Sequence, residues 1–318
     1  MLYENVLIRV DLNTKDPDDP KFQVIDETIR FYLKHSRKVI LATHYKNPRP
    51  SSRGAERRSD PEWMATAPPG LRHDEFSIQF LIPPLQKQFN IPIEFLIDLK
   101  RPTSNNQLFL LENIRLFYGE TDNDPAFAEK LSEMAEFYVN EAFASSHRQH
   151  ASLDKILDYL PSTLGFSHAK ELHMLELILS RIQRPILAVI GGVKWESKRH
   201  IIEKLQAVCD DVFLGDGMLQ TGALDISKER QEDLAQRVAK AGTVIWNGAL
   251  GKIEDKPYDA GSLWFNDLLQ SVVSEKSVII GGGDLTKFLA PDYATYSSTA
   301  GGALLQFIVE FLTIRKTL

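Results

Sequence analysis

Short apolar segments alternate with amphipathic segments along most of the chain. In the first half, runs rich in Val, Ile, Leu and Phe are typical of buried strands, at residues 5–10, 37–43, 92–98, 107–113 and 137–143. The second half repeats the rhythm, with runs at 185–192, 211–215, 243–248 and 277–283. Between strands, apolar residues recur with helical spacing, as in 26–35 and 124–136. Alternating strands and helices indicate βαβ units, so we predict an α/β fold with parallel sheets.

A long helical pattern separates the two halves. We interpret residues 166–183 as a helix that connects a first domain of residues 1–165 to a second domain of residues 184–318. A chain of 318 residues is long enough for two α/β domains that each bury a core. Residues 45–73 are rich in Pro, Ser and Arg and lack periodicity, which predicts a long surface loop.

Composition narrows the class of protein. The chain is 43% hydrophobic and 25% charged, as in ordinary globular proteins, and its net charge of -6 argues against a general nucleic-acid or membrane-surface binder. A single cysteine, Cys209, permits no internal disulfide and suits a reducing compartment. The first residues lack the apolar core of a signal peptide, and no run approaches the length of a membrane span. We therefore expect a cytoplasmic protein that binds neither nucleic acid nor membrane.

Glycines follow three strands of the second half. They are Gly191-Gly192, Gly248 after Asn247, and Gly281 to Gly283 before Asp284. Glycines at strand ends let backbone N–H groups approach phosphate oxygens, while Lys194 and Lys198 supply charge and Asp284 is able to hold Mg²⁺. One glycine pair is weak evidence, because tight turns use glycine for geometry alone. Three together with two lysines favour phosphate binding.

Cationic and amide side chains follow the strands of the first half. Arg9, Asp11 and Asn13 close the first strand, and the later strand ends carry His44, Glu112, Arg115, Asn140 and Arg148. If these strands are neighbours, the groups form a basket for a small anion with carboxylate or phosphate groups. Arg9 and Glu112 are equally compatible with paired surface or interdomain charges. His147 and His150 have a metal-like spacing, but no further partner is suitably spaced, so we rank metal behind anion binding.

Seven segments in order resemble signature segments of the phosphoglycerate kinase family. They are RVDLN, LLENIR, YVNEAF with HRQHAS, ILAVIGGVKWESK, VIWNGALGKIE, VIIGGGD and SSTAGGA, and they extend to about residue 307. The resemblance implies two Rossmann-like domains with parallel sheets, joined by a helix and a hinge, that face each other across a cleft. The first would hold 3-phosphoglycerate or its acyl phosphate and the second Mg²⁺ with ATP or ADP, and hinge closure would bring them together.

The resemblance also implies a role for each matching residue. The acid substrate would be bound by Asp11, Asn13, His44, Arg115 and Arg148. The nucleotide would be bound by Lys194, Lys198, Asn247, Glu254 at the ribose, the Gly281, Gly282 and Gly283 turn, and Asp284 through the metal. The phosphoryl group in transfer would be contacted by Lys198 and by the turn of Thr299, Gly301 and Gly302.

One departure from the family concerns an arginine in the first helix. An ungapped alignment places Lys21 where the family has an essential arginine. A lysine keeps the charge but loses the planar fork that contacts two oxygens at once. If the arginine stabilises the transition state, its loss costs on the order of a thousandfold in rate, part of which Lys21 would restore as a catalytic cation.

A second departure lies in GDGMLQTGALDIS. In the family a long stretch with helices and a core strand follows the glycine-methionine turn, whereas here only Leu219 to Ala223 intervene. We therefore expect a truncated C-terminal domain with a trimmed pocket for the base, at a cost of a few kcal/mol in nucleotide binding. Such a deletion exposes a sheet edge or an apolar face, which a homodimer would cover.

Smaller departures lie at other motif positions. Leu285 replaces a small residue after GGGD, and Ala300 replaces the first glycine of a triple glycine. The arginine that usually follows the histidine motif is matched either by Arg49 or by no residue. The nearby Arg53, Arg57, Arg58 and Arg72 belong to a solvated loop or contact a larger anionic substrate, and the solvated loop is the simpler reading.

Two hypotheses of different class follow from these observations. In the first, the protein is a kinase that moves a phosphoryl group between a nucleotide and the carboxylate of 3-phosphoglycerate or a related acid. In the second, it is a non-catalytic relative that binds a phosphorylated acid or a protein partner. We favour the kinase because so many charged residues of the motifs are retained.

Overall fold

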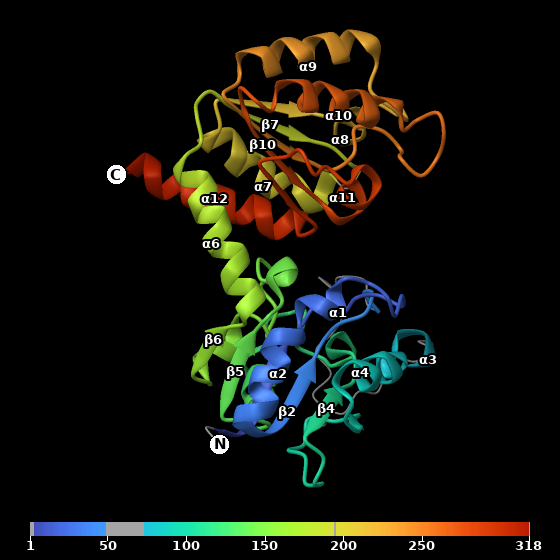
Figure 1. The fold of residues 1–318 in the computed structure, drawn as a ribbon, viewed down its shortest axis with the longest axis vertical. Coiled ribbons are helices and arrows are strands. Elements are labelled where there is room, and N and C mark those ends of the chain that lie inside the picture. Colours follow the sequence, from blue (N-terminus) through green and yellow to red (C-terminus); the bar gives the residue numbers. More distant parts are fainter. Residues whose placement is uncertain (1–2, 49–72, 194, 318) are drawn as a thin grey trace. The chain divides into compact units, whose positions relative to one another are not determined.

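The structure is a computed structural model that describes residues 3–48, 73–193 and 195–317. The chain divides into two compact units, Met1–Glu171 and Leu172–Leu318. The division falls within helix α6 (Phe166–Ser180), close to the middle of the connecting helix expected at residues 166–183. Each unit is built around one parallel sheet (Figure 1).

The first unit contains a six-stranded sheet in the order β3-β4-β2-β1-β5-β6. Every pair of neighbouring strands is parallel, so the carboxyl ends of all six strands lie along one edge. The strands are β1 (Tyr3–Arg9), β2 (Ser36–Ala42), β3 (Ile93–Leu96), β4 (Leu108–Leu111), β5 (Phe137–Asn140) and β6 (Ser162–Leu164).

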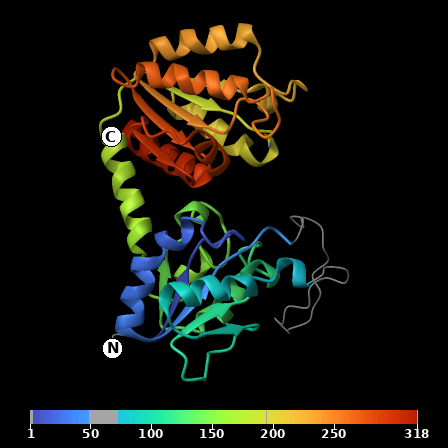
Figure 2. The ribbon, with the colours of Figure 1, turned by 45° about the vertical axis from the view of Figure 1, so that its right-hand side comes forward.

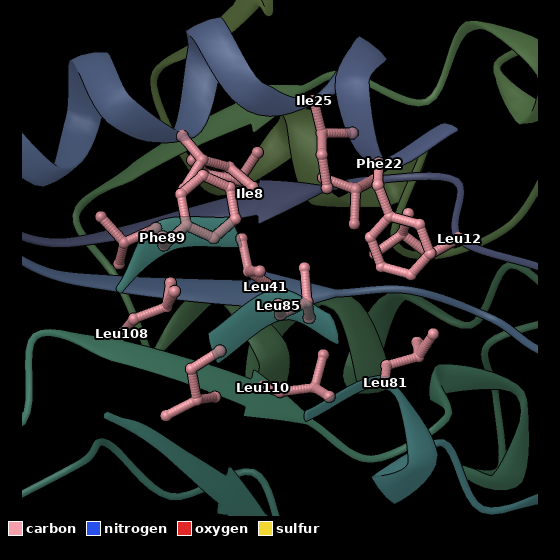
Figure 3. Packing of buried hydrophobic residues seen from close by; sticks show 14 of the residues in the cluster. Ile8, Leu12, Phe22, Ile25, Leu41, Leu81, Leu85, Phe89, Leu108 and Leu110 are labelled. Carbon is pink, nitrogen blue, oxygen red and sulfur yellow. The ribbon is translucent and has the colours of Figure 1, made fainter. Parts of the chain in front are cut away.

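Both faces of this sheet are covered, because successive side chains of a strand point to opposite faces. On one face Ile8 and Leu41 pack against Ile25, Leu85 and other residues of the first helices (Figure 3). The opposite face packs against α5 and η4. The helical segments of this unit are α1 (Lys21–Val24), α2 (Asp26–His35), α3 (His73–Phe76), α4 (Ile82–Phe89), α5 (Pro125–Ser132), and the 3₁₀ turns η1 (Gln79–Leu81), η2 (Ile114–Leu116), η3 (Phe143–Ser145) and η4 (Lys155–Asp158).

The second unit contains a five-stranded parallel sheet in the order β11-β10-β9-β7-β8. The chain moves outward from β7 to β8 and then, from β9 onward, to the other side of β7. The order therefore reverses between β7 and β9, where doubly wound sheets bind ligands. The strands are β7 (Ile186–Ile190), β8 (Asp211–Leu214), β9 (Thr243–Asn247), β10 (Ser277–Gly281) and β11 (Tyr296–Ser298).

Helices cover both faces of the second sheet. Figures 1 and 2 show α9 and α10 on one face and α7 and α12 on the other. The core between the sheet and α9 and α10 includes the fully buried Trp246, whose ring meets that of Phe265 edge-on. The helices are α7 (Trp195–Val208), α8 (Asp216–Leu219), α9 (Lys228–Lys240), α10 (Ala260–Val272), α11 (Gly283–Leu289) and α12 (Gly301–Thr317).

The predicted α/β class with two parallel sheets is confirmed, and every strand predicted from an apolar run is present. The edge strands β6 and β11 were not predicted, because STL and YSS are short and lack an apolar run. In the part of the chain that the structure describes, no helix has both the length and the hydropathy needed to span a bilayer. The predicted loop at 45–73 lies mostly outside the described residues, including Arg49, Arg53, Arg57, Arg58 and Arg72.

Candidate active site

Four strands of the first sheet bring three arginines and one histidine to its carboxyl edge. Arg9 ends β1, His44 follows β2, Arg115 lies in η2 after β4, and Arg148 follows η3 after β5. These strands are neighbours, in the order β4-β2-β1-β5, as the predicted anion-binding basket requires. We call the group of these four side chains the cationic basket. Arg9, His44 and Arg115 are each at most 5% exposed. Buried cations in such number are costly without anionic partners, so their position at a strand edge indicates anion binding.

Asp11 places a carboxylate among these cations. Its Oδ1 accepts a hydrogen bond from Lys21 Nζ at 3.3 Å, and its Oδ2 accepts one from Ser145 Oγ at 3.1 Å. Burial alone would raise the pKa of Asp11, but the charges of Lys21 and Arg9 and the backbone N–H of Asn13 lower it below its usual range. Lys21, predicted as the substitute for the family's arginine, therefore lies beside a predicted substrate residue.

Arg115 has the least satisfied guanidinium of the group. Its Nη1 donates to the Lys46 carbonyl at 2.7 Å, while its buried Nε and Nη2 have no hydrogen-bond partner among the residues that the structure describes. Burial and the charges of Arg148 and Arg9 lower the pKa of Arg115 to about 10. Each unsatisfied buried donor costs on the order of 1–3 kcal/mol. A ligand oxygen would satisfy these donors, so Arg115 is prepared for an anion.

Lys46 forms a turn that links two predicted substrate residues. Its N–H donates to Asn13 Oδ1 at 2.9 Å, and its carbonyl accepts the hydrogen bond from Arg115. The backbone of Lys46 has a φ of 53°, a left-handed conformation that glycine adopts more easily. A lysine gives no sequence signal for a left-handed turn, so this role was not predicted.

The two histidines and the arginine of HRQH, residues 147–150, follow β5 in the same unit. Burial and the charge of Arg9 lower the pKa of Arg148, while Asp11 acts in the opposite direction. His150 Nδ1 lies 3.7 Å from Glu120 Oε1. Across the described residues, no group of three or more His, Cys, Asp or Glu side chains is arranged to hold a metal ion.

The alternative that Arg9 and Glu112 are paired surface or interdomain charges is wrong. Both residues are buried, and they have different partners. Arg9 contacts Ser152 and His44, whereas Glu112 accepts hydrogen bonds from Ser77 Oγ and from backbone N–H groups. Glu112 therefore fixes the loop before α4, and Arg9 belongs to the cationic basket.

In the second unit, Lys198 lies at the switch point between β7 and β9. Its Nζ donates to the Gly191 carbonyl at 2.9 Å and to Asn247 Oδ1 at 3.3 Å. A Cβ added at Gly248, which has a φ of 88°, would lie 3.0 Å from this Nζ and 2.6 Å from the Gly191 carbonyl oxygen. Glycine is required there by both backbone conformation and space, and the ammonium group is held where two turns meet.

Asn247 connects this lysine to the remaining glycine turns. Its Nδ2 donates to the Gly301 carbonyl at 3.1 Å, at the start of α12. A Cβ at Gly281 or Gly301 would lie within 3.0 Å of the same Nδ2. Gly282 has a φ of 120°, so the turn after β10 also depends on glycine. The structure thus assembles the predicted Lys198, Asn247, Gly281 to Gly283 and Gly301 into one group.

Other predicted residues of this unit are less tightly placed. Asp284 and Thr299 are exposed beside the glycine turns, and Glu254 is exposed in the loop between β9 and α10. Gly302 follows Gly301 in the first turn of α12, and Lys194 lies outside the described residues. An exposed carboxylate beside a glycine turn is compatible with Mg²⁺, which commonly uses one or two carboxylates and takes its other ligands from phosphates and water.

Comparison with known protein families identifies the family of this chain. A family model described as phosphoglycerate kinase matches residues 2–223 and 219–310. The chain belongs to the phosphoglycerate kinase family. This confirms the resemblance predicted from the motifs, and with it the class of kinase that acts on a carboxylate.

Individual relatives of the phosphoglycerate kinase family match nearly the whole chain. "Phosphoglycerate kinase" of Bartonella henselae is 28% identical, over 96% of this chain and 93% of that protein. The protein of that name from Prochlorococcus marinus (strain AS9601) is 29% identical, over 96% and 92%. The phosphoglycerate kinase structure from Coxiella burnetii has a TM-score of 0.67 at 23% identity and covers 99% of this chain and 97% of that one, which shows a shared fold.

The phosphoglycerate kinase model matches in two segments that meet at residues 219–223. In the structure, α8 ends at Leu219, and a loop with left-handed residues Gln220 and Gly222 leads towards α9. The side chains of Leu219 and Leu224, at the two ends of this loop, are 44% and 48% exposed. The alignment with the Bartonella henselae protein is 391 residues long, so it includes positions at which this 318-residue chain has no residue.

Proposed function

We propose that this protein transfers a phosphoryl group between a nucleotide, ATP or ADP, and the carboxylate of 3-phosphoglycerate or a closely related acid. The observation that carries the proposal is the group formed by Lys198, Asn247 and Gly301 at the switch point of the second sheet. A cation, an amide and the first turn of a helix meet there, as a phosphate chain requires. The cationic basket of the first unit supplies the matching site for an acid.

The acid would bind through the first unit. Arg115 offers two unpaired donors, and His44 and Arg148 add further donors beside it. Asn13 is positioned by the Lys46 turn, and Asp11 keeps Lys21 in place through their ion pair. Asp11 is ionised near neutral pH, so it accepts hydrogen bonds from hydroxyl groups of the acid. The basket therefore selects a small molecule that carries both negative charge and a hydroxyl group.

In the second unit, Lys198 would act on the phosphoryl group in transfer. Its ammonium group donates to two neutral oxygens, the Gly191 carbonyl and the Asn247 side-chain amide. Phosphoryl oxygens carry more negative charge than a carbonyl or amide oxygen, so the ammonium group would exchange these contacts for the moving group. Mg²⁺, held by Asp284 and the nucleotide, would neutralise phosphate charge. Transfer requires acid and nucleotide to meet, so the proposal includes the hinge closure predicted from the sequence.

Lys21 would supply the charge that an arginine supplies elsewhere in the family. Its contact with Asp11 supports this assignment, because Asp11 is itself a predicted substrate residue. The ammonium group neutralises charge on the phosphoryl group but cannot contact two of its oxygens in one plane. We therefore propose a working but slow kinase.

The short connection at Leu219 to Ala223 supports a trimmed pocket for the base. The exposed Leu219 and Leu224 flank this connection, and β8 is the edge strand beside it. We propose that the C-terminal domain is truncated here and that a second copy of the chain covers the exposed leucines. Sedimentation of the full-length protein at increasing concentration tests the dimer, and a single monomeric species at every concentration would contradict it.

A coupled assay tests the activity. Purified protein is given Mg-ATP with 3-phosphoglycerate, and ADP release is followed. We expect turnover that falls on the order of a thousandfold in Lys198→Ala, because one cation on the moving group is lost. Lys204→Ala, on the same helix α7, is the matched control and should keep the wild-type rate.

The same assay separates the kinase from a non-catalytic relative. Acid binding by calorimetry without ADP release, for 3-phosphoglycerate and for analogues of its carboxylate and hydroxyl groups, would establish the non-catalytic alternative. Turnover that Lys198→Ala leaves unchanged would show that the phosphoryl group is transferred elsewhere and would overturn the assignment of Lys198.

A further inference from the structure

Arg9 is a completely buried member of the cationic basket. Its Nε donates to Ser152 Oγ at 3.0 Å, and its Nη1 donates to the carbonyl of Val10. Its Nη2 lies 3.2 Å from His44 Nδ1. Arg9 thus joins a buried hydroxyl group on one side to a predicted substrate residue on the other.

The positive charge of Arg9 is balanced through Ser152 by a buried carboxylate. Ser152 Oγ donates to Glu120 Oε1 at 2.7 Å, and Ser152 N donates to Glu120 Oε2 at 2.9 Å. Burial alone would raise the pKa of Glu120, but the charge of Arg9 and the hydrogen bonds from Ser152 lower it. The result is a continuous series of buried, hydrogen-bonded side chains, Glu120–Ser152–Arg9–His44, that ends in the cationic basket.

The contact between Arg9 Nη2 and His44 Nδ1 determines the tautomer of His44. A guanidinium group has only N–H donors and stays protonated in proteins. His44 Nδ1 must therefore accept the hydrogen bond with a lone pair, which leaves the ring proton on Nε2. We propose that Arg9 is a positioning residue that fixes His44 as its neutral Nε2–H tautomer, so that His44 serves the acid site as a donor through Nε2.

The charges that face His44 agree with this assignment. They are Arg9 from β1, Asp11 from the loop after β1, Arg115 from η2 and Arg148 from the loop after η3. Burial and the three arginines lower the pKa of His44 well below its usual range, and only Asp11 opposes them. His44 stays neutral at pH values where an ordinary histidine, with a pKa of about 6.5, would titrate.

A neutral His44 has a consequence for the acid site, and this consequence rests on the proposed function. Binding of a phosphorylated acid should show no titration of His44 between pH 5.5 and 8. A free histidine in the same place would lose its positive charge over this interval and weaken binding of the anion as pH rises. Arg9 therefore makes the acid site insensitive to pH in the range where histidine sites ordinarily change.

The first test needs no activity. In ¹⁵N-labelled full-length protein, the imidazole nitrogens distinguish an Nε2–H ring from an Nδ1–H ring and from a charged ring, and the His44→Gln variant assigns the signal. We expect an Nε2–H pattern for His44 that does not change between pH 5.5 and 8. An Nδ1–H pattern, or a titration near pH 6.5, would overturn the inference whether or not the protein proves to be a kinase.

Two variants then test whether Arg9 sets the tautomer of His44. In Arg9→Met the donor to Nδ1 is lost, so His44 should titrate at a higher pH than in the wild type. Ser152→Ala is the matched control, because it breaks the link to Glu120 and leaves the Arg9–His44 contact, so the Nε2–H pattern should remain. An Arg9→Met protein that keeps the wild-type pattern at every pH would overturn the inference. If Arg9→Met does not fold, the wild-type and Ser152→Ala spectra decide.

Calorimetry with 3-phosphoglycerate connects the tautomer to the site. The ratio of dissociation constants at pH 5.5 and pH 8, compared between wild type and Arg9→Met, cancels titration of the ligand itself. We expect the ratio to change by about tenfold in the variant. An unchanged ratio would refute the role of Arg9 in acid binding. No binding by the wild type, with the Nε2–H pattern intact, would instead count against the proposed function alone.

Discussion

The two units prepare for anions in different ways. The first unit concentrates buried arginines and a histidine at the edge of its sheet, and Arg115 keeps two donors unpaired. The second unit uses glycine turns around Lys198, whose ammonium group donates to neutral oxygens of Gly191 and Asn247. Fixed cationic side chains suit a small acid, whereas backbone N–H groups and a lysine suit a phosphate chain.

The difference also concerns stability. In the first unit, buried like charges lower the pKa values of Arg115 and Arg148, which means that folding brings these cations together at a cost. In the second unit, the turns require close backbone approach but little buried charge. The free energy of unfolding of the first unit should therefore rise when its cations are removed or when an anion binds. The free energy of unfolding of the second unit should change less under the corresponding changes.

Arg115→Met gives the largest expected effect. Loss of the two unpaired donors should weaken binding of 3-phosphoglycerate by about a hundredfold, which calorimetry would measure. The same change should raise the free energy of unfolding of the ligand-free protein by about 1 kcal/mol, because a buried and incompletely paired charge is replaced by an apolar side chain. Urea unfolding measures this second effect.

Arg101→Met provides the control for this prediction. Arg101 lies in the same unit, but its side chain is half exposed and pairs with Glu136. The substitution should change neither acid binding nor stability appreciably. If Arg115→Met destabilised the free protein as strongly as the loss of a core side chain, the contrast between the two units would be wrong.

Lys21→Arg tests the charge beside Asp11. A guanidinium group in place of the ammonium group restores a planar fork, so kcat for ADP formation should rise by about tenfold. Lys21→Gln should lower kcat, because the contact with Asp11 loses its charge. A Lys21→Arg protein no faster than the wild type would show that this position does not limit the reaction.

Acid should destabilise the first unit before the second. Burial lowers the pKa of His44 and of His168, so the unfolded chain binds more protons than the folded unit below about pH 6.5. The free energy of unfolding should therefore fall by about 1–2 kcal/mol between pH 6.5 and 5.5. The histidines of the second unit, His173 and His200, are exposed rather than buried.

Hydrogen exchange measures the loss of stability of each unit separately, provided that the exchange rates are corrected for the intrinsic effect of pH. Protection of β1 should fall more than protection of β7 as pH is lowered from 6.5 to 5.5. The raised pKa of Glu141, caused by burial, acts in the opposite direction at lower pH, so the measurement should stay above pH 5.5. Equal losses in both strands would contradict the prediction.

Lys46→Gly should have the smallest effect. Glycine relieves the left-handed backbone, so the free energy of unfolding should rise by about 1 kcal/mol or less. The N–H and carbonyl that hold Asn13 and Arg115 are retained, so acid affinity should stay within about threefold of wild type. Calorimetry and urea unfolding test both statements, and a large loss of affinity would assign a direct contact to the lysine ammonium group.

The sequence was sufficient for the α/β class and for most of the strands, because a buried parallel strand requires a continuous apolar run. It failed for β6 and β11, where pairing with a neighbouring strand imposes extended structure on short polar segments. Motif residues such as Lys198, Asn247 and Gly301 were identified because glycine and charge at strand ends leave a local signal.

The sequence by itself determined the family, the apolar runs of the two sheets and the chemical types of the site residues. Only the tertiary structure decided that Arg9 is buried against His44 rather than paired with Glu112, and that Lys46 forms the turn between Asn13 and Arg115. These contacts join residues far apart in the chain. Strand order brings them together, and no local pattern encodes which side chains then meet.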